Sequence, residues 1–280
     1  MPNYCEISDA LIIYELSAKD ITTFKGGGII EKTIFPKTEE ALFKYAGEAD
    51  FILGRGSNLI ISDGLKKITA LSLKMLNKVS CFNDEIYTQA GATAKNLLDE
   101  ALKNSLTGFE FLHRIPGSVG GLIKMNAGAF GQQISDTLTS CLVLSDGVVK
   151  EVKPSFGYRT SDLDGIAISA KFKLKRSKSE DIENRIKSNC LKRVSTQPSN
   201  PSCGSVFKNP PFASAGKIIE EAGFKGFRIG GAEVSDKHCN FIINRGGATA
   251  DDFLQIVDKI EKTVYYKYGI RLEREFKLLD

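Results

Sequence analysis

The sequence predicts an α+β protein, in which amphipathic helices are mixed with strands that pair mostly as antiparallel hairpins. Two dipeptides between apolar runs, Asn83-Asp84 and Asp146-Gly147, predict tight hairpin turns. The segment 250–268 repeats apolar residues at helical spacing and predicts a long helix. A chain of 280 residues is long enough for a substantial core and for two lobes.

The N-terminal part is expected to begin with a compact β-α-β unit. In chain order we expect a strand, a helix, two apolar strands around a glycine turn, a hairpin and an amphipathic helix, at residues 29–35, 38–49, 50–64, 79–91 and 93–108. Thr38 is the expected N-cap of the first helix, and Gly108 lies beyond the end of the second. The core face of that second helix consists of Leu97, Leu98, Ala101 and Leu102.

The remaining elements follow a glycine-rich stretch at 115–131. They are a hairpin, an alternating strand, three helices and a closing strand, at residues 138–152, 166–174, 180–194, 215–222, 250–268 and 270–279. The first of these helices has one apolar face, made of Ile182, Ile186, Cys190 and Val194. A capping box from Thr249 to Asp252 begins the last helix. Because a Pro/Ser/Asn-rich linker follows residue 194, we expect a domain boundary within 176–202.

The closing strand alternates between two faces. Its apolar residues are Ile270, Leu272, Phe276 and Leu278, and its charged residues are Arg271, Glu273, Glu275 and Lys277.

Charge and composition narrow the class of protein. The net charge of +4 and the pI of about 8.6 suit anionic small molecules but are too weak to indicate nucleic acid. The N-terminus has no basic segment followed by a long apolar run, and no stretch is apolar enough for a membrane span. Six scattered cysteines and two histidines predict reduced thiols and no metal site. We therefore expect a cytoplasmic protein.

Two glycine-rich turns are candidate anion sites. The stretch 115–131, "IPGSVGGLIKMNAGAFG", has five glycines in seventeen positions, and "LGRGSN" at 53–58 has two more beside a serine. Such turns bring backbone N–H groups close to a phosphate, where a side chain would obstruct the approach. Neither turn matches the G-x-G-x-x-G or Walker A pattern. The alternative is a pair of glycine turns between buried strands.

Two polar segments are candidate ligand contacts. "CGSVFKNP" at 203–210 places a hydroxyl beside a cation and an amide, which suits a phosphorylated or carboxylated ligand. "GYRTSD" at 157–162 places a tyrosine and an arginine in a turn. The alternatives are a polar turn before helix 215–222, an exposed arginine, and for Glu275 a solvated strand face.

Together these segments resemble the UDP-N-acetylenolpyruvoylglucosamine reductase (MurB) family, in its shorter branch. From about residue 20 onward, seven motifs occur in the family's order: "GRGSNLIISD", "GFEFLHRIPGSVGGLIKMNAGAFG", "GYRTS", "CGSVFKNP", "AGKIIEEAGFKG", "GGAEVSDKHCNFIIN" and "LEREF". The resemblance implies a two-subdomain FAD-binding fold of the vanillyl-alcohol-oxidase type plus an α+β substrate-binding lobe, with domains at 1–75, 76–190 and 191–280. Arg55 and Arg114 depart from the expected small residues, and Lys25-Gly26-Gly27-Gly28 is unusually glycine-rich.

The implied activity is reduction of UDP-N-acetylglucosamine enolpyruvate to UDP-N-acetylmuramate by NADPH through FAD, for peptidoglycan precursor synthesis. The implied catalytic residues are Arg159, Ser205 and Glu275. The implied FAD contacts are Gly54, Arg55, Gly56, Ser57, Asn58, Ile115, Pro116, Gly117, Ser118, Gly120, Gly121, Asn126 and Gly128. The implied substrate contacts are Tyr158, Lys208, Asn209 and Lys237. Only small-molecule partners are implied, without metal, nucleic acid, membrane or obligate protein partner.

The residue types agree with this chemistry. A guanidinium such as Arg159 stabilises charge that develops on a carboxylate. An uncharged hydroxyl such as Ser205 can donate a proton to a strongly basic enolate, and Glu275 would support or orient that donor. Two other functions stay open: an FAD-dependent oxidase or dehydrogenase of an alcohol or sugar, and a non-catalytic nucleotide- or RNA-binding protein.

Overall fold

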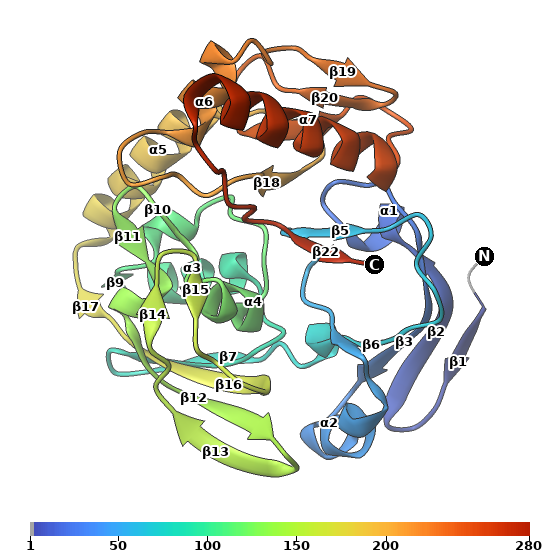
Figure 1. Ribbon diagram of the computed structural model, residues 1–280. Helices are drawn as coiled ribbons and strands as arrows, with labels where there is room; N and C mark the ends of the chain where they lie inside the picture. Colours follow the sequence, from blue (N-terminus) through green and yellow to red (C-terminus); the bar gives the residue numbers. More distant parts are fainter. Residues whose placement is uncertain (1–2) are drawn as a thin grey trace.

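The first of three larger sheets is built from the β-α-β unit and the strands before it. The computed structural model describes residues 3–280 (Figure 1). The sheet order is β1 (Tyr4–Glu6), β2 (Ala10–Ser17), β3 (Ile29–Pro36), β6 (Thr69–Leu71) and β4 (Phe51–Ile52). Strands β3, β6 and β4 run parallel, whereas β1, β2 and β3 are antiparallel. The short helical elements here are α1 (Ala18–Ile21), α2 (Glu39–Tyr45), η1 (Ala46–Glu48) and η2 (Leu73–Met75). Thr38 caps α2 as predicted.

The second sheet contains both predicted hairpins. Its order is β13 (Val148–Val152), β12 (Leu138–Ser145), β16 (Ile166–Lys173), β8 (Glu85–Gln89) and β7 (Val79–Phe82), all antiparallel. The turns at Asn83 and at Asp146-Gly147 have positive φ, which confirms both turn predictions. Short elements surround this sheet: η3 (Glu110–Leu112), β10 (Gly128–Ala129), β11 (Gln132–Gln133), η4 (Ile134–Asp136), β14 (Phe156–Gly157) and β15 (Thr160–Ser161).

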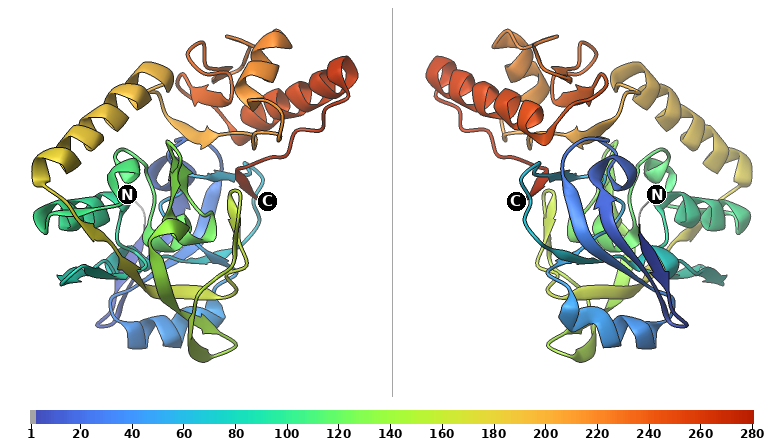
Figure 2. Two further views of the ribbon diagram at one scale, coloured as in Figure 1. Left: turned by 90° about the vertical axis from the view of Figure 1, so that its left-hand side faces the viewer. Right: turned by 90° about the vertical axis from the view of Figure 1, so that its right-hand side faces the viewer.

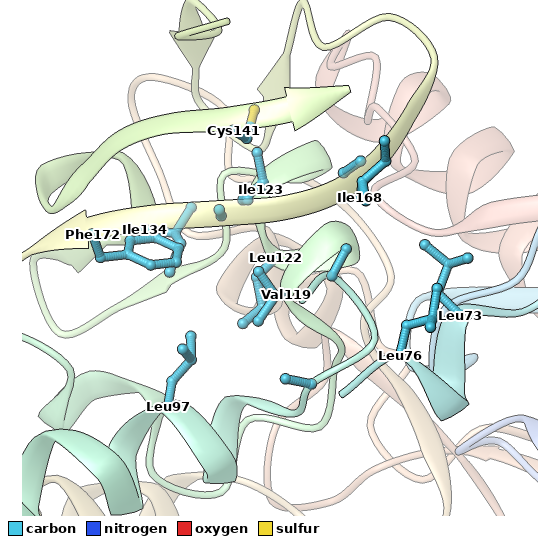
Figure 3. Packing of buried hydrophobic residues seen from close by; sticks show 14 of the residues in the cluster. Leu73, Leu76, Leu97, Val119, Leu122, Ile123, Ile134, Cys141, Ile168 and Phe172 are labelled. Carbon is cyan, nitrogen blue, oxygen red and sulfur yellow. The ribbon is translucent and has the colours of Figure 1, made fainter. Parts of the chain in front are cut away.

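Helices α3 (Ala94–Lys103) and α4 (Val119–Lys124) cover one face of the second sheet. Figure 3 shows Leu97 of α3, Leu122 and Ile123 of α4 and Phe172 of β16 meeting in this core. The predicted helix 93–108 ends earlier than expected, at Lys103. Its last predicted residues instead form strand β9 (Leu106–Thr107), which pairs with β17 (Lys175–Arg176). Leu102 is only half-buried, whereas the other three predicted core residues are buried.

The third sheet lies after the linker, and its hydrophobic core also includes Phe24 and Ile60 from the N-terminal part of the chain. Its order is β18 (Ser202–Ser205), β21 (Phe241–Asn244), β20 (Ala232–Val234) and β19 (Arg228–Ile229). Helices α6 (Ala215–Glu221) and α7 (Ala250–Tyr268) pack with it at the top of Figure 1. The predicted capping box of α7 is present. All five residues of its apolar stripe are buried: Phe253, Ile256, Val257, Ile260 and Val264.

Helix α5 (Ser179–Thr196) connects the second and third sheets (Figure 2). It is continuous through residues 190 and 191, where the resemblance placed a domain boundary. Its predicted apolar face is buried only at Ile182, while Val194 is 47% exposed. Among residues 3–280, no helix combines the length and apolar character that a membrane crossing requires, and no cluster of metal-ligating side chains is found.

The C-terminal segment joins the third sheet to the first domain. Residues 270–276 run beside the segment after β18, where Lys208 N–H donates to Glu273 O and Glu275 N–H donates to Val206 O. Only β22 (Lys277–Leu279) is a regular strand, and it pairs in parallel with β5 (Leu59–Ile61). The predicted strand 270–279 is therefore shorter than expected, because its first residues bond to an irregular segment.

The glycine-rich segment 26–28 lies at the same junction. A Cβ atom on Gly26 would lie 2.3 Å from Ala248 O, and one on Gly27, at φ +107°, would lie 2.2 Å from Ile61 O. No side chain fits between these backbones. Gly26 thus lets the chain approach the segment before α7, while Gly27 lets it approach the end of β5.

Asn244 closes this junction with its side-chain amide. The buried amide donates to the carbonyl oxygens of Phe24 at 3.0 Å and Lys25 at 2.9 Å, and its oxygen accepts from the N–H groups of Gly246 and Ala248.

We expect Asn244→Ala to lower the free energy of unfolding by ~2–4 kcal/mol, because it leaves several buried backbone groups unpaired. Denaturant unfolding followed by circular dichroism measures this loss. Asn77→Ala, at an exposed asparagine with one local bond, is the matched control. Equal stability of the two variants would contradict the assigned role of Asn244.

Candidate active site

A cleft of about 1320 Å³ is lined by residues from the parts of the chain that carry the three larger sheets. Its walls are the turn 53–59, the segment 114–130, the residues around Arg159, the linker with β18, and the C-terminal residues 275–279. Both predicted glycine turns therefore line the same cavity. Figure 1 shows α5 and the hairpin β10–β11 on one side of this region and β5 with β22 on the other.

Cations dominate the lining of the cleft. Among residues 3–280, nine lysines and arginines line it together with one carboxylate, Glu275. The nine are Lys25, Arg55, Lys74, Arg114, Lys124, Arg159, Arg193, Lys237 and Lys277. Since the whole chain carries a net charge of only +4, positive charge is concentrated here. A cleft lined by one sign of charge attracts polyanionic ligands such as diphosphates.

The turn 54–58 faces the second glycine turn across the cleft. Gly56 has φ +61°, and a Cβ atom on it would lie 2.1 Å from Ile21 O. A Cβ atom on Gly54 would lie 3.0 Å from the hydroxyl of Ser118. The predicted flavin contacts Arg55 and Ser57 line the cleft as well. The two turns are thus close enough to contact one ligand together.

Asn58 has a role that the sequence did not predict. Its amide donates to the carbonyl oxygen of Glu275 at 3.0 Å, although the two residues are 217 positions apart. The N–H of Lys277 donates to Asn58 O at 2.9 Å. The predicted flavin turn is therefore bonded directly to the segment that carries Glu275.

The second turn leads into α4. Ile115, Pro116, Gly117, Ser118, Gly120 and Gly121 all line the cleft. A Cβ atom on Gly120 would make only ordinary contacts, the nearest at 3.5 Å to Ala90 Cβ. A Cβ atom on Gly117 would be tighter, at 3.2 Å from Leu122. Contacts among residues 3–280 would therefore tolerate a Cβ atom at position 120, which makes this position a test of the predicted flavin contact.

We expect Gly120→Val to give folded but colourless protein, because its side chain occupies the space of the cofactor in the cleft. The flavin content is measured as the ratio of flavin to protein absorbance after purification. Circular dichroism tests whether the variant is folded. Gly47→Val, at a glycine with nothing within 4 Å of its Cβ position, is the control. Normal flavin content in folded Gly120→Val would remove this turn from the cofactor site.

Arg159 and Glu275 form an ion pair at one wall of the cleft. The Nε atom of Arg159 lies 3.2 Å from Glu275 Oε1, and its NH2 group donates to Gly128 O at 2.9 Å. Arg159 has φ +57°, in the left-handed region where non-glycine residues are uncommon. The tight β14–β15 turn thus aims the guanidinium at Glu275.

The carboxyl group of Glu275 is well shielded, with 15% of its side chain exposed. Burial raises its pKa, while the charges of Arg159 and Lys208 oppose the rise. Glu275 is therefore not the solvated strand residue of the alternative interpretation. Its pairing with Arg159 could not be predicted, because the two residues lie on distant segments.

Ser205 lies at the end of β18 and lines the same cleft. The next residue, Val206, accepts the backbone N–H of Glu275, which places Ser205 beside the glutamate segment. Among residues 3–280, its hydroxyl has no hydrogen-bond partner within the protein. The neighbouring Cys203 is buried, and burial raises the pKa of its thiol to about 12, so it stays protonated.

The other predicted contact residues fall into two groups. Gly128 and Lys237 line the cleft, and the ammonium of Lys237 donates to Val194 O. Four others lie outside the lining: Asn126, Tyr158, Lys208 and Asn209.

These four side chains have structural partners or are exposed. Asn126 is buried and donates to Gly157 O, and Asn209 accepts the N–H of Ala215 at the start of α6. Lys208 pairs with Glu273 at 2.6 Å, and Tyr158 is 51% exposed against the Arg159 guanidinium. The three predicted catalytic residues thus line one cleft, whereas these four side chains lie outside its lining, although the charge of Lys208 acts on Glu275.

Some residues of the cleft had no distinct signal in the sequence. Thr23 lines the cleft, and its buried hydroxyl has no hydrogen-bond partner in the described part of the chain, 3–280, which suits a ligand contact. Arg193 and Phe130 also line it. Arg193 lies on a helix and Phe130 among glycines, so pattern alone assigned neither a role.

Two family models match separate parts of the chain. A model of an FAD binding domain matches residues 32–153, and a model of the C-terminal domain of UDP-N-acetylenolpyruvoylglucosamine reductase matches residues 197–279. The second match begins directly after α5.

Whole-length relatives carry the same description. The chain is 38% identical to a UDP-N-acetylenolpyruvoylglucosamine reductase of Oceanobacillus iheyensis over 97% of its own length and 93% of the relative's. It is 41% identical to that of Shouchella clausii over 89% and 85%. The crystal structure of the Thermus caldophilus reductase superposes with a TM-score of 0.84 at 33% identity and covers both chains fully.

Proposed function

Because the chain belongs to the UDP-N-acetylenolpyruvoylglucosamine reductase family, we infer that it is an FAD-dependent oxidoreductase. It uses NADPH to reduce UDP-N-acetylglucosamine enolpyruvate to UDP-N-acetylmuramate, in the synthesis of peptidoglycan precursors. Its fold is the α+β arrangement that the sequence predicted, an FAD-binding part followed by a C-terminal domain.

The residues of the cleft fit the cofactor. Glycine turns on two sides leave room for a diphosphate, cations surround it, and the unpartnered Thr23 hydroxyl can bond a polar group. Bound FAD supplies the transfer of hydride from NADPH to the substrate. The predicted contacts in 54–58, 115–121 and Gly128 are the residues that we assign to it.

The observation that carries the catalytic assignment is the convergence of Arg159, Ser205 and Glu275 on one cationic cleft. Arg159 binds the carboxylate of the substrate and stabilises the charge that develops there. The free hydroxyl of Ser205 donates a proton to the adjacent carbon. Glu275 holds Arg159 in place and, with its raised pKa, supports the proton donor.

We propose fewer substrate contacts than the family resemblance implied. Lys237 lies in the cleft and is our candidate for an anionic group of the UDP-sugar. Tyr158, Lys208 and Asn209 remain predictions for the bound state, because their side chains do not reach the lining.

Domain organisation and cell location belong to the same proposal. We retain the unit boundary at 75 and move the second from 190 to the end of α5, since that helix is continuous. We place the enzyme in the cytoplasm and assign it no nucleic-acid, membrane or obligate protein partner. The alternatives, an alcohol or sugar oxidase and a non-catalytic binding protein, have no support in the whole-length relatives.

The test uses purified protein, NADPH and UDP-N-acetylglucosamine enolpyruvate. We expect yellow protein and consumption of NADPH that requires the enolpyruvyl substrate. Colourless protein that binds no added FAD would support the binding-protein alternative. Flavoprotein that oxidises sugars or alcohols without consuming NADPH would support the oxidase alternative.

A further inference from the structure

Strand β18 is irregular directly before Ser205. It advances by three residues from Ser202 to Ser205, whereas its partner β21 advances by only two over the same length, from Ile243 to Phe241. The extra residue forms a β-bulge, in which Gly204 has φ +83°. Bulges redirect a neighbouring side chain and are frequent beside active sites. The bulge therefore helps to set the direction of the Ser205 side chain.

The side chain of Asn240 continues the ladder after the main-chain pairing ends. Its Oδ1 atom accepts the N–H of Phe207 at 2.9 Å, and its Nδ2 group donates to Phe207 O at 2.8 Å. The backbone oxygen of Asn240 also accepts the N–H of Val206 at 2.9 Å. Both Asn240 and Phe207 are buried, so loss of the amide would leave two backbone groups unpaired away from water. One asparagine thus fixes the two residues that follow Ser205.

The histidine two residues earlier holds Asn240 in turn. The Nδ1 atom of His238 accepts the N–H of Asn240 at 3.2 Å, and its ring packs edge-on against Phe241 at 4.9 Å between centroids. A Cβ atom on Gly216 of α6 would lie 3.0 Å from this ring, so the helix packs closely against it. Burial lowers the pKa of His238, which favours the neutral ring that can accept a hydrogen bond.

The segment 206–208 contacts the Glu275 segment on its other side. The N–H of Glu275 donates to Val206 O at 2.8 Å, and the next two residues of 206–208 pair with the chain just before Glu275. The segment therefore lies between Asn240 and Glu275. Any displacement of 206–208 changes the position of Ser205 relative to Glu275.

The position of the Ser205 hydroxyl depends on this backbone. Among residues 3–280, the hydroxyl has no hydrogen-bond partner within the protein that would hold it in place. We propose that Asn240 is a positioning residue, which together with the bulge at Gly204 aligns the Ser205 hydroxyl for proton donation. The proposal rests on the proposed function, in which Ser205 is the proton donor. Alignment matters because a misplacement of about 1 Å costs on the order of 10²-fold in rate.

The test compares Asn240→Ala in two backgrounds, with and without the Ser205 hydroxyl. In the otherwise unmodified enzyme, we expect it to slow reoxidation at saturating enolpyruvyl substrate about 10-fold to 100-fold. Reduction by NADPH and the flavin content should stay normal, because neither requires that hydroxyl. In Ser205→Ala, the added Asn240→Ala should slow reoxidation no further, because both substitutions then remove the same contribution. Stopped-flow flavin absorbance measures each half-reaction.

Asn104→Ala is the matched control. It removes two side-chain hydrogen bonds of a half-buried asparagine at the end of α3, outside the cleft, and should leave both half-reactions unchanged. A merely structural role of Asn240 predicts a loss that multiplies with that of Ser205→Ala, or an equal decrease of both half-reactions. Either result would overturn the proposal, and so would normal reoxidation of folded Asn240→Ala.

Gly204→Ala tests the alignment without removing a buried hydrogen bond, and it decides the question if Asn240→Ala does not fold. A Cβ atom at position 204 would meet no atom of residues 3–280 within 4 Å, but alanine is strained at φ +83°. We expect reoxidation to slow about 10-fold when Ser205 is present and not at all in Ser205→Ala. Gly223→Ala, at φ +94° with an equally free Cβ position outside the cleft, is the control.

The outcomes separate this proposal from the proposed function. Slower reoxidation of Gly204→Ala in both backgrounds would mean that the added methyl group obstructs the substrate, and would overturn the proposal. Equal rates for Gly204→Ala and Gly223→Ala would overturn it as well. Normal reoxidation of Ser205→Ala alone would instead refute the proton-donor role of Ser205, and the positioning role with it.

Discussion

Replacing Ser205 with alanine should leave reduction of the enzyme by NADPH at its normal rate and slow reoxidation by the enolpyruvyl substrate by roughly 10²–10⁴-fold. The first half-reaction requires no proton donor at the substrate carbon. The second does, and the Ser205 hydroxyl is free and lines the cleft beside the Glu275 segment. Stopped-flow absorbance at the flavin band measures the two half-reactions separately.

The reductive half-reaction is the internal control for folding and for FAD content. Ser205→Cys keeps a proton-bearing group in the same place and should recover part of the lost rate. If Ser205 only contacts substrate, Ser205→Ala will raise KM and leave the saturated reoxidation rate nearly unchanged. That outcome would refute the assignment of Ser205 as proton donor.

Arg159→Lys should lower turnover on the order of a hundredfold or more, the usual cost of removing one donor that stabilises developing charge. Lysine keeps the charge but lacks the planar fork that binds a carboxylate with two parallel hydrogen bonds. Arginine and lysine have similar backbone strain at the φ of +57° found at position 159, so the exchange tests the side chain alone.

Steady-state consumption of NADPH, with flavin content and the NADPH half-reaction as controls, measures this effect. Lys150→Arg, at an exposed position on β13, checks that a cation exchange elsewhere has no effect. Near-normal turnover of Arg159→Lys would refute the catalytic role of Arg159 and leave only its structural pairing with Glu275. A loss confined to KM would mean that Arg159 binds the substrate without stabilising the transition state.

Local structure was largely predictable from the sequence. The caps at Thr38 and Thr249, the hairpin turns and the apolar stripe of α7 depend on contacts within a few residues, and all are present. The motifs also identified the reductase family before any geometry was known. Two predicted lengths were wrong because contacts with distant segments outweighed local propensity. The helix predicted at 93–108 ends early because Leu106 and Thr107 pair with β17. The strand predicted at 270–279 is shorter because its first residues bond to the irregular segment after β18.

The arrangement of the site was not predictable in the same way. The sequence determined by itself which elements form and which residue types can act, because the hydrogen bonds of turns and caps and the period of an apolar face are local. The tertiary structure decided that Glu275 pairs with Arg159 and that Asn58 holds its segment. It also placed Gly26 against Ala248 and Gly27 and Gly28 against the end of β5. Among residues 3–280, it left the Nε atom of Arg193 without a hydrogen-bond partner. These outcomes depend on which surfaces bury one another, and burial is settled by the packing of whole domains and not by neighbouring residues.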